Sequence, residues 1–303
     1  MKRTLALTIA AGLFTVAMEC ATLADDDLDE SGLQQILHPF YLEEAGQYEF
    51  TLDGTAATRL KLVTTPVMSW TGLENGLTSG DLFVWTRGGR AEVIGCIGSL
   101  PRNESERLIF HEFHALTLQP LPAMRVANQQ WAPEKAGADL HPIPDAPRPA
   151  ERSQQRLVQM RSLARQFSAR METASRSEER LRMLPQPVFR NDSQNELADG
   201  AIFAFVWTLG TDPELLLLVE SVRQDTDEGF VWCYAPLRFT NRTVALEHRG
   251  NEVWTVGHHD SVSMPGEPYI TRLTGTTSIV ELEDRAEIIS EAKVEQLSTH
   301  EGE

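Results

Sequence analysis

The sequence predicts an α+β protein that consists mainly of antiparallel β-structure. Three observations support this fold class. Two parts of the chain repeat each other, each part alternates short apolar runs with turn-forming residues, and a helical periodicity lies between the two parts. We therefore expect two pseudo-symmetric meander repeats, which form a sandwich or an open barrel, and one long amphipathic helix between them.

The N-terminal segment predicts export. A short basic start precedes an apolar run from Leu5 to Met18, and small residues up to Ala24 are followed by three aspartates. This order is typical of a secretory signal peptide, here residues 1–24, and the apolar run is too short for a membrane span. We therefore expect a periplasmic or secreted protein without a transmembrane segment. The alternative is that the segment is retained as an N-terminal anchor.

Residues 25–65 are expected to form an N-terminal extension with two strands, at 47–52 and 58–64. At the other end, residues 276–303 form an acidic tail that contains two basic residues, Arg285 and Lys293. This tail is expected either to contain a short helix or to be disordered.

The repeat is clearest in two windows of seventeen residues. Residues 83–99 read FVWTRGGRAEVIGCIGS and residues 205–221 read FVWTLGTDPELLLLVES, and seven positions are identical in a gapless alignment. Unrelated sequences of ordinary composition would share about one. Flanking matches extend the first repeat over about 66–131 and the second over 187–254, within a second β region that runs to residue 260.

Each repeat predicts a β-meander. Gly88 and Gly89 supply the positive φ of a tight hairpin turn in the first copy. The strands of the second copy are apolar on both alternating faces, which places that hairpin at the centre of the body and the first hairpin nearer an edge. Four tryptophans are expected at equivalent repeat positions in the core, or alternatively stacked against a ligand such as a carbohydrate: Trp85, Trp131, Trp207 and Trp254.

Between the repeats, residues 132–149 are rich in proline and predict an extended connector. Residues 150–185 then predict one amphipathic helix, because apolar residues recur at three- and four-residue steps. Nine arginines and four glutamates lie between Arg148 and Arg182. We expect this helix to cover the sheet with its arginines near carboxylates, and the alternative is a membrane-surface or partner-binding helix.

One histidine-rich strand is the best candidate for chemistry. His111 and His114 are three positions apart in a predicted strand, so they face opposite sides and cannot chelate one ion. Glu112 and His114 share a face. The weak metal-site candidates are therefore these two and a second cluster after the last repeat strand: Glu112, His114, His258, His259 and Asp260.

Four strings of the sequence carry a resemblance: GDLFVW, WAPEKAG, QMRSLARQF and DGAIFAFVWTLGTDPELLLLVES. Together, from about Pro66 to Trp254, they resemble a family of exported proteins from planctomycete-type bacteria. The resemblance implies export and a shared fold. It implies no activity, cofactor or site residue.

The composition and motifs limit the classes of function. A formal net charge of −17 argues against nucleic acid as a partner. The sequence has no GxSxG, SxxK or CxxC motif and no phosphate-binding glycine loop, so we predict no catalytic residue and no cofactor. Cys96 and Cys233 are expected to be buried free thiols, with a disulfide as the alternative.

The sequence therefore favours a non-enzymatic envelope protein that binds a partner protein or a small-molecule ligand, in a groove between equivalent strands. The alternative is a metal-dependent hydrolase that uses the candidate metal ligands. A third hypothesis is a purely structural role in an envelope assembly.

Overall fold

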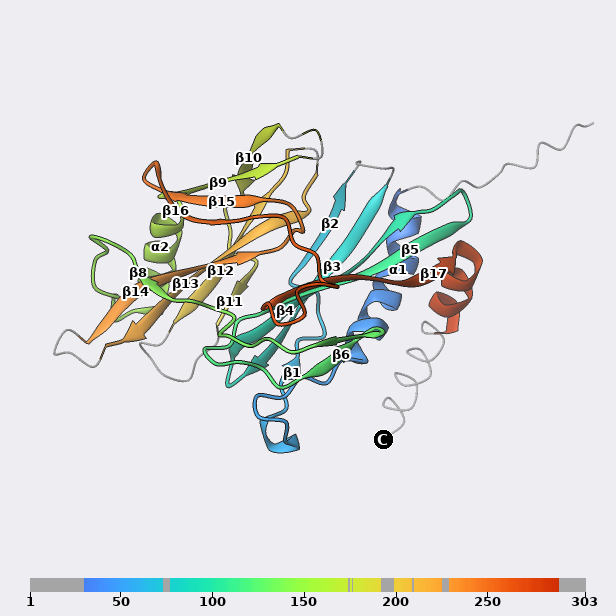
Figure 1. Cartoon of the computed structure of the whole chain (residues 1–303), viewed down its shortest axis with the longest axis horizontal. Helices are drawn as coiled ribbons and strands as arrows, with labels where there is room; N and C mark the ends of the chain where they lie inside the picture. The colour runs from blue at the N-terminus through green and yellow to red at the C-terminus, as the bar shows by residue number, and fades with distance from the viewer. Residues whose placement is uncertain are drawn as a thin grey trace, which may run out of the picture.

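The computed structural model describes residues 30–72, 77–173, 175, 177–191, 199–208, 210–224 and 229–288 (Figure 1). The predicted signal peptide, residues 1–24, and the last part of the acidic tail lie outside the described residues. Within them, antiparallel strands predominate over helices, so the predicted α+β class is confirmed.

The first half of the molecule contains α1 (Glu30–Gly46), the 3-10 turn η1 (Ala56–Thr58), β1 (Lys61–Leu62), β2 (Met68–Gly72), β3 (Thr78–Arg87), β4 (Arg90–Pro101), β5 (Glu106–Ala115), β6 (Met124–Val126), β7 (Gln129–Trp131) and, from the end of the chain, β17 (Tyr269–Ser278). Its sheet has the order β1-β3-β4-β5-β17, and β2 also pairs with β3. Strands β6 and β7 form a separate hairpin.

The second half contains β8 (His141–Pro142), α2 (Ser153–Ala164), β9 (Phe167–Glu172), β10 (Glu178–Met183), β11 (Phe189–Arg190), β12 (Gly200–Val206), β13 (Pro213–Arg223), β14 (Phe230–Arg238), β15 (Val244–His248) and β16 (Asn251–Val256). Its sheet has the order β16-β15-β9-β10-β12-β13-β14-β8, and β11 pairs with β12. All the strand pairs of both halves are antiparallel.

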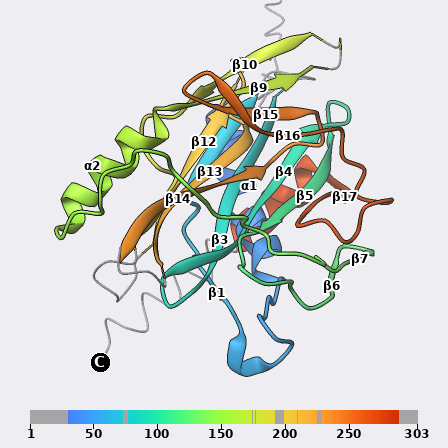
Figure 2. The ribbon, with the colours of Figure 1, turned by 60° about the vertical axis from the view of Figure 1, so that its left-hand side comes forward.

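The two sheets pack face to face, and each carries its helix on the outer side (Figures 1 and 2). Alternation along the strands produces these layers. In β3, Phe83 and Trp85 pack on the α1 side, whereas Leu82 and Val84 pack against the second sheet. In β12, Phe203 and its neighbours at alternate positions pack on the α2 side. The first hairpin was expected nearer an edge, but β3 and β4 are buried on both faces because α1 covers one and the second sheet covers the other.

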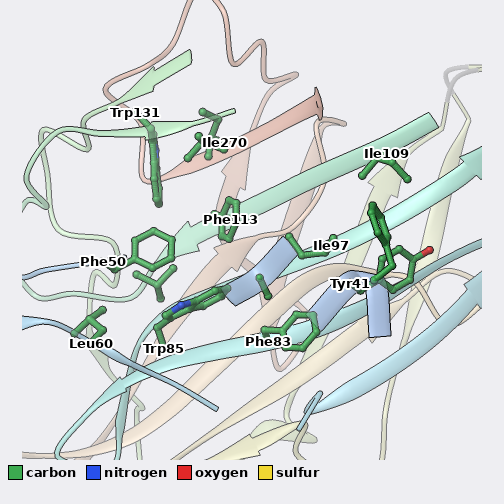
Figure 3. Packing of buried hydrophobic residues seen from close by; sticks show 14 of the residues in the cluster. Tyr41, Phe50, Leu60, Phe83, Trp85, Ile97, Ile109, Phe113, Trp131 and Ile270 are labelled. Carbon is green, nitrogen blue, oxygen red and sulfur yellow. The ribbon is translucent and has the colours of Figure 1, made fainter. Parts of the chain in front are cut away.

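Aromatic rings from the segment after α1, from β3, β5 and β7 pack together in the core that also contains the buried side chains of α1 (Figure 3). Phe50, Trp85, Phe113 and Trp131 are each at most 1% exposed. The ring centroids of Phe50 and Trp85 are 5.0 Å apart, and those of Trp85 and Phe113 are 5.7 Å apart, both in edge-on geometry. Such contacts add to the hydrophobic gain of burial, so this core fixes α1 and β5 relative to each other.

The predicted helix over residues 150–185 is wrong in extent. Helix α2 ends at Ala164, and the chain continues as strands β9 and β10. Phe167 and Met171 are four positions apart, a spacing that suits one face of a helix and one face of a strand equally. Ala169 between them is also buried, which makes the alternation that of a strand. The expected contacts of arginines with carboxylates are present, for example between Arg170 and Glu247 at 3.0 Å.

The gapless alignment of the two repeat windows is wrong by two residues. Phe83 pairs with Gly95, whereas Phe205 pairs with Leu215 rather than with Leu217. The difference lies in the hairpin loops. The last pair of the first hairpin, Arg87 with Arg90, encloses residues 88–89, and the last pair of the second, Val206 with Pro213, encloses residues 207–212. The duplication itself stays a prediction.

This shift separates the tryptophans that the alignment made equivalent. Trp85 lies within β3 and is buried, whereas Trp207 lies after the end of β12 and is only partly buried. The Arg242 guanidinium lies 5.2 Å from the Trp207 ring centroid. Trp131 is fully buried and Trp254 is half-buried, so the expected equivalence in the core does not hold.

The N-terminal region differs from expectation, whereas the described part of the acidic tail contains a short helix, one of its two expected alternatives. Helix α1 occupies residues that were expected to precede the strands, and the stretches 47–52 and 58–64 contribute only an isolated bridge and the short β1. In the acidic tail, β17 runs to Ser278, and residues 279–288 are helical. Ser278 and Glu281 begin that helix as a capping box, because each side chain bonds the backbone N–H of the other.

Cys96 and Cys233 are both buried free thiols. No helix in the ranges that the structure describes has both the length and the apolar character needed to cross a membrane.

Candidate functional site

A polar groove crosses the outer side of the first half. It consists of two adjoining hollows with volumes of about 550 and 680 Å³. The first hollow lies between α1, β17 and the helix of residues 279–288, and the second lies between the end of α1, β5 and the β6–β7 turn. Glu44 and Thr274 line both hollows and therefore mark their junction. We call the two hollows together the Glu44 groove.

A buried histidine lies beside Glu44. His111, on β5, lines the second hollow and is 3% exposed. Its Nδ1 is 2.6 Å from the Tyr48 hydroxyl, and its Nε2 is 3.5 Å from Glu44 Oε2. The second distance is too long for a good hydrogen bond, and Nε2 has no hydrogen-bond partner among the described residues. The site therefore holds unused hydrogen-bonding capacity, which is costly for a buried group.

Burial sets the protonation states of His111 and of the two residues beside it. It lowers the pKa of His111 to about 4, so the imidazole is neutral at neutral pH. Burial also raises the pKa of Glu44 and that of Tyr48 above their ordinary values. Because His111 is neutral, it does not cancel the charge of an ionised Glu44.

The groove has an acidic lining. Four carboxylates and two arginines line its described part: Glu44, Glu49, Glu281, Asp284, Arg125 and Arg285. Arg285 Nη1 lies 3.9 Å from Glu43 Oε2, outside the lining. The remaining lining groups include threonine hydroxyls and side-chain amides, so the groove offers many hydrogen-bond donors and acceptors and more polar than apolar surface.

The turn beneath the second hollow has an unusual backbone. Ala127, between β6 and β7, has a φ of 53°, in the left-handed region that residues other than glycine seldom adopt. Ala127 lines the second hollow together with Tyr48 and His111. Backbone positions of this kind are enriched at functional sites.

Three of the five predicted metal ligands lie elsewhere, around a buried tyrosine between the two sheets. The Tyr269 hydroxyl donates to Glu112 Oε1. The Tyr269 ring centroid is 4.8 Å from that of His259 and 6.3 Å from that of His114. Arg238, from the second half, lies 5.7 Å from the same ring centroid. Glu112 and His114 thus share a face, as predicted, and His111 faces the other way.

These residues are held in uncharged forms. Burial raises the pKa of Glu112 to about 8 and lowers the pKa values of His114 and His259 to about 4. His114 Nδ1 lies 2.6 Å from the Ala115 carbonyl oxygen, and His259 Nε2 lies 3.0 Å from Ser261 Oγ. The cluster is therefore a network of hydrogen bonds at the junction of the two halves.

The other two predicted ligands are exposed. Asp260 accepts from the Val262 backbone N–H at 3.0 Å and from Ser263, and His258 lies beside it at the surface. In the part of the chain that the structure describes, no group of three or more His, Cys, Asp or Glu side chains surrounds a point where a metal ion could bind. The metal-dependent hydrolase stays a prediction that this geometry does not support.

The Glu44 groove was not predicted from the sequence. His111 was considered only as a partner of His114, and α1, which carries Glu44, was not expected. Tyr48 and Glu44 are four residues apart, but their meeting with His111 depends on how α1 packs on β5. The apolar positions Leu33 and Leu37, one helical turn apart, were the available signal for α1.

Comparison with models of protein families, with curated proteins and with solved structures finds no match. The function proposed below is therefore argued from the sequence and the geometry of this chain.

Proposed function

We propose that the protein is an exported, non-enzymatic envelope protein that binds a small ligand in the Glu44 groove. One observation carries the proposal: His111 is buried at the groove with Nε2 unsatisfied, 3.5 Å from Glu44 Oε2. Buried polar groups in folded proteins are nearly always hydrogen-bonded to protein, water or a ligand. A polar ligand group placed at this junction would supply the missing partner.

The size and position of the groove support the proposal. Each hollow falls within the range of about 300–1,000 Å³ that is typical of small-molecule sites. The rigid aromatic core beneath the groove holds β5 and α1 in place. Support for export comes from the N-terminal pattern of the sequence.

The experiment is a ligand screen by NMR with uniformly labelled protein. The probes are neutral sugars and polyols, primary amines, carboxylates and small amides. We expect at least one probe to shift the resonances of His111 and Thr274 saturably. The Gly275→Leu variant should abolish the shifts, because a side chain at Gly275 meets no heavy atom within 4 Å and extends into the first hollow.

The matched control is Gly257→Leu. Gly257 also has open space around its Cβ position and lies outside the groove, so this variant should bind like the wild type. If no probe shifts the groove resonances, or if Gly257→Leu abolishes binding as Gly275→Leu does, the proposed function is wrong.

A further inference from the structure

The chemistry of the Glu44 groove identifies a class of ligand; this inference rests on the proposed function. The first step is the tautomer of His111. Glu44 Oε2, an acceptor, lies 3.5 Å from His111 Nε2, so a hydrogen on Nε2 is favoured there over a lone pair. The Tyr48 hydroxyl lies 2.6 Å from His111 Nδ1. We assign Nδ1 as the acceptor of this bond, which leaves the hydrogen of the neutral imidazole on Nε2.

The second step is the pair of groups that results. The Nε2–H donor of His111 and the Oε2 acceptor of Glu44 stand 3.5 Å apart. The other oxygen of Glu44, Oε1, already accepts from Gln47 Nε2 at 3.0 Å. A donor and a carboxylate acceptor therefore lie side by side at the junction of the two hollows, and among the described residues neither atom has a hydrogen-bond partner at normal length.

Ligand groups differ in how well they satisfy the donor His111 Nε2–H and the acceptor Glu44 Oε2 together. An ammonium group has no acceptor for Nε2–H, and a carboxylate has no donor for Glu44 and is repelled by it. A hydroxyl group both accepts and donates. Two hydroxyls on adjacent carbons present two such oxygens at about hydrogen-bond separation, so one can accept from Nε2–H while the other donates to Oε2.

The rest of the lining favours hydroxyls over peptide amides. Gln47, Asn128 and Thr276 add neutral groups that can donate and accept, and Asp284 adds a further acceptor. Peptide ligands usually anchor apolar or aromatic side chains in desolvated pockets, whereas the lining of this groove is more polar than apolar. The two hollows meet at Glu44, so a chain of linked sugar units could extend from one into the other.

Access requires one movement. His111 Nε2 is covered, and the Glu44 side chain beside it is 20% exposed. Glu44 lies near the C-terminal end of α1, so a shift of its side chain that keeps the carboxylate at the junction admits a hydroxyl group to Nε2 without moving the backbone.

We propose that the Glu44 groove binds a neutral carbohydrate or related polyol, and that a vicinal pair of hydroxyls bridges His111 Nε2–H and the Glu44 carboxylate. Glu44 and His111 are the groups that contact the ligand. Tyr48 acts through His111 and is a positioning residue.

The experiment compares probe classes on the same labelled protein. The sugar arm contains methyl α-glucoside, methyl β-galactoside, N-acetylglucosamine, myo-inositol, maltotriose and cellotriose, and the other arms contain spermidine, succinate, N-methylacetamide and cyclohexanol. We expect saturable shifts of the His111 and Thr274 resonances with at least one member of the sugar arm. Cyclohexanol, which has a single hydroxyl, should bind much more weakly.

Matched variants test the role of the carboxylate. Glu44→Gln should weaken binding of the responding sugar about tenfold, because a hydrogen bond to a charged acceptor is replaced by one to a neutral group. Glu43→Gln changes the neighbouring carboxylate, which does not line the groove, and should leave the dissociation constant unchanged.

The outcomes separate the two claims. If another arm shifts the groove resonances and no sugar or polyol does, the carbohydrate inference is overturned and the proposed function stands. If a sugar binds but Glu44→Gln binds it as tightly as Glu43→Gln does, the bridging geometry is wrong. If no probe in any arm shifts the groove resonances, both the carbohydrate inference and the proposed function are wrong.

Discussion

The two halves of the molecule fasten their helices to their sheets by different chemistry. In the first half, the Tyr41 hydroxyl on α1 lies 3.1 Å from Ser79 Oγ and 2.7 Å from Ser99 Oγ. In the second half, Arg156 on α2 donates to Asp199 Oδ2 at 2.9 Å, and both side chains are at most 6% exposed. The buried tether of α1 is thus a set of neutral hydroxyls and that of α2 is a buried ion pair, and the two should respond differently to mutation.

The halves also differ beyond the ends of their helices. In the second half, His248 Nε2 lies 3.1 Å from Gln166 Oε1, which also accepts from Arg249 Nε at 3.0 Å. In the first half, His111 Nε2 has no such partner among the described residues and lies 3.5 Å from Glu44 Oε2. One buried histidine is thus satisfied by a neighbouring amide and the other keeps an open hydrogen-bonding position, which marks the first half as the place to look for a ligand.

The largest effect is expected from breaking the buried ion pair of the second half. Asp199→Ala leaves the Arg156 guanidinium buried without its carboxylate and should lower the free energy of unfolding by about 3–5 kcal/mol. Urea denaturation followed by tryptophan fluorescence measures this. Replacing both partners by apolar residues, as in Arg156→Met with Asp199→Ala, should recover part of the loss. A loss below about 1 kcal/mol in the single variant would show that the pair does not hold α2.

The junction of the halves gives the next effect, through Glu112. Its pKa is about 8 in the folded protein and 4.5 as an ordinary glutamate. As the pH rises, the Glu112 carboxyl group therefore loses its proton in the unfolded state before it does so in the folded state. The contribution of Glu112 to the free energy of unfolding falls as the pH rises from about 4.5 to 8. Glu112→Gln removes the titration. The variant should gain roughly 1–3 kcal/mol relative to the wild type between pH 4 and pH 8, measured as the difference in unfolding free energy. A difference that is constant with pH would contradict the raised pKa.

Removing the neutral tether of the first half should cost less than removing the ion pair. Tyr41→Phe deletes one hydroxyl and leaves Ser79 and Ser99 able to bond other groups, so we expect a loss of about 1 kcal/mol. The same urea denaturation measures it. A loss of unfolding free energy as large as that caused by Asp199→Ala would mean that the hydroxyl tether and the ion pair stabilise their helices equally, which contradicts the expected difference.

The smallest effect concerns a second tether of α1. His38 Nδ1 lies 2.7 Å from Asp81 Oδ2, and the hydrogen bond with Asp81 raises the pKa of His38. The resulting stabilisation is complete below the ordinary histidine pKa of about 6.5 and is lost as the pH rises through the raised value. Because the side chain is 38% exposed, screening should keep the effect below about 1 kcal/mol.

NMR titration of the His38 ring measures this shift directly. The wild-type pKa should lie above 6.5, and Asp81→Asn should bring it down. A pKa that does not respond to Asp81→Asn would rule out the tether.

The sequence predicted the strands better than the helices, for physical reasons that particular residues illustrate. Gly88 and Gly89 have φ values of 56° and 84°, which glycine adopts freely, so the first hairpin turn was recognisable. The strand expected at 229–239 is β14, Phe230–Arg238. Helix α1 was missed although Leu33 and Leu37 mark its buried face, because Pro39 interrupts the helical pattern.

The candidate site was largely beyond sequence reasoning. Glu112 and His114 were correctly placed on one strand face, but His259 approaches them only through Tyr269, whose strand β17 returns from the end of the chain. His111 depends on a helix that the sequence analysis did not predict. Local patterns report which face a residue occupies, whereas the partner across that face is set by tertiary packing.

The most direct test of the account is the protonation of His111, measured from the ¹⁵N chemical shifts of its two ring nitrogens as a function of pH. The account predicts a neutral ring at pH 7 with the hydrogen on Nε2, and titration near pH 4. Tyr48→Phe removes the donor to Nδ1 and should therefore weaken the preference for the tautomer with the hydrogen on Nε2. A ring that carries its hydrogen on Nδ1, or that titrates near the ordinary value of about 6.5, would contradict the claim that a donor and a carboxylate stand ready for a ligand in this groove.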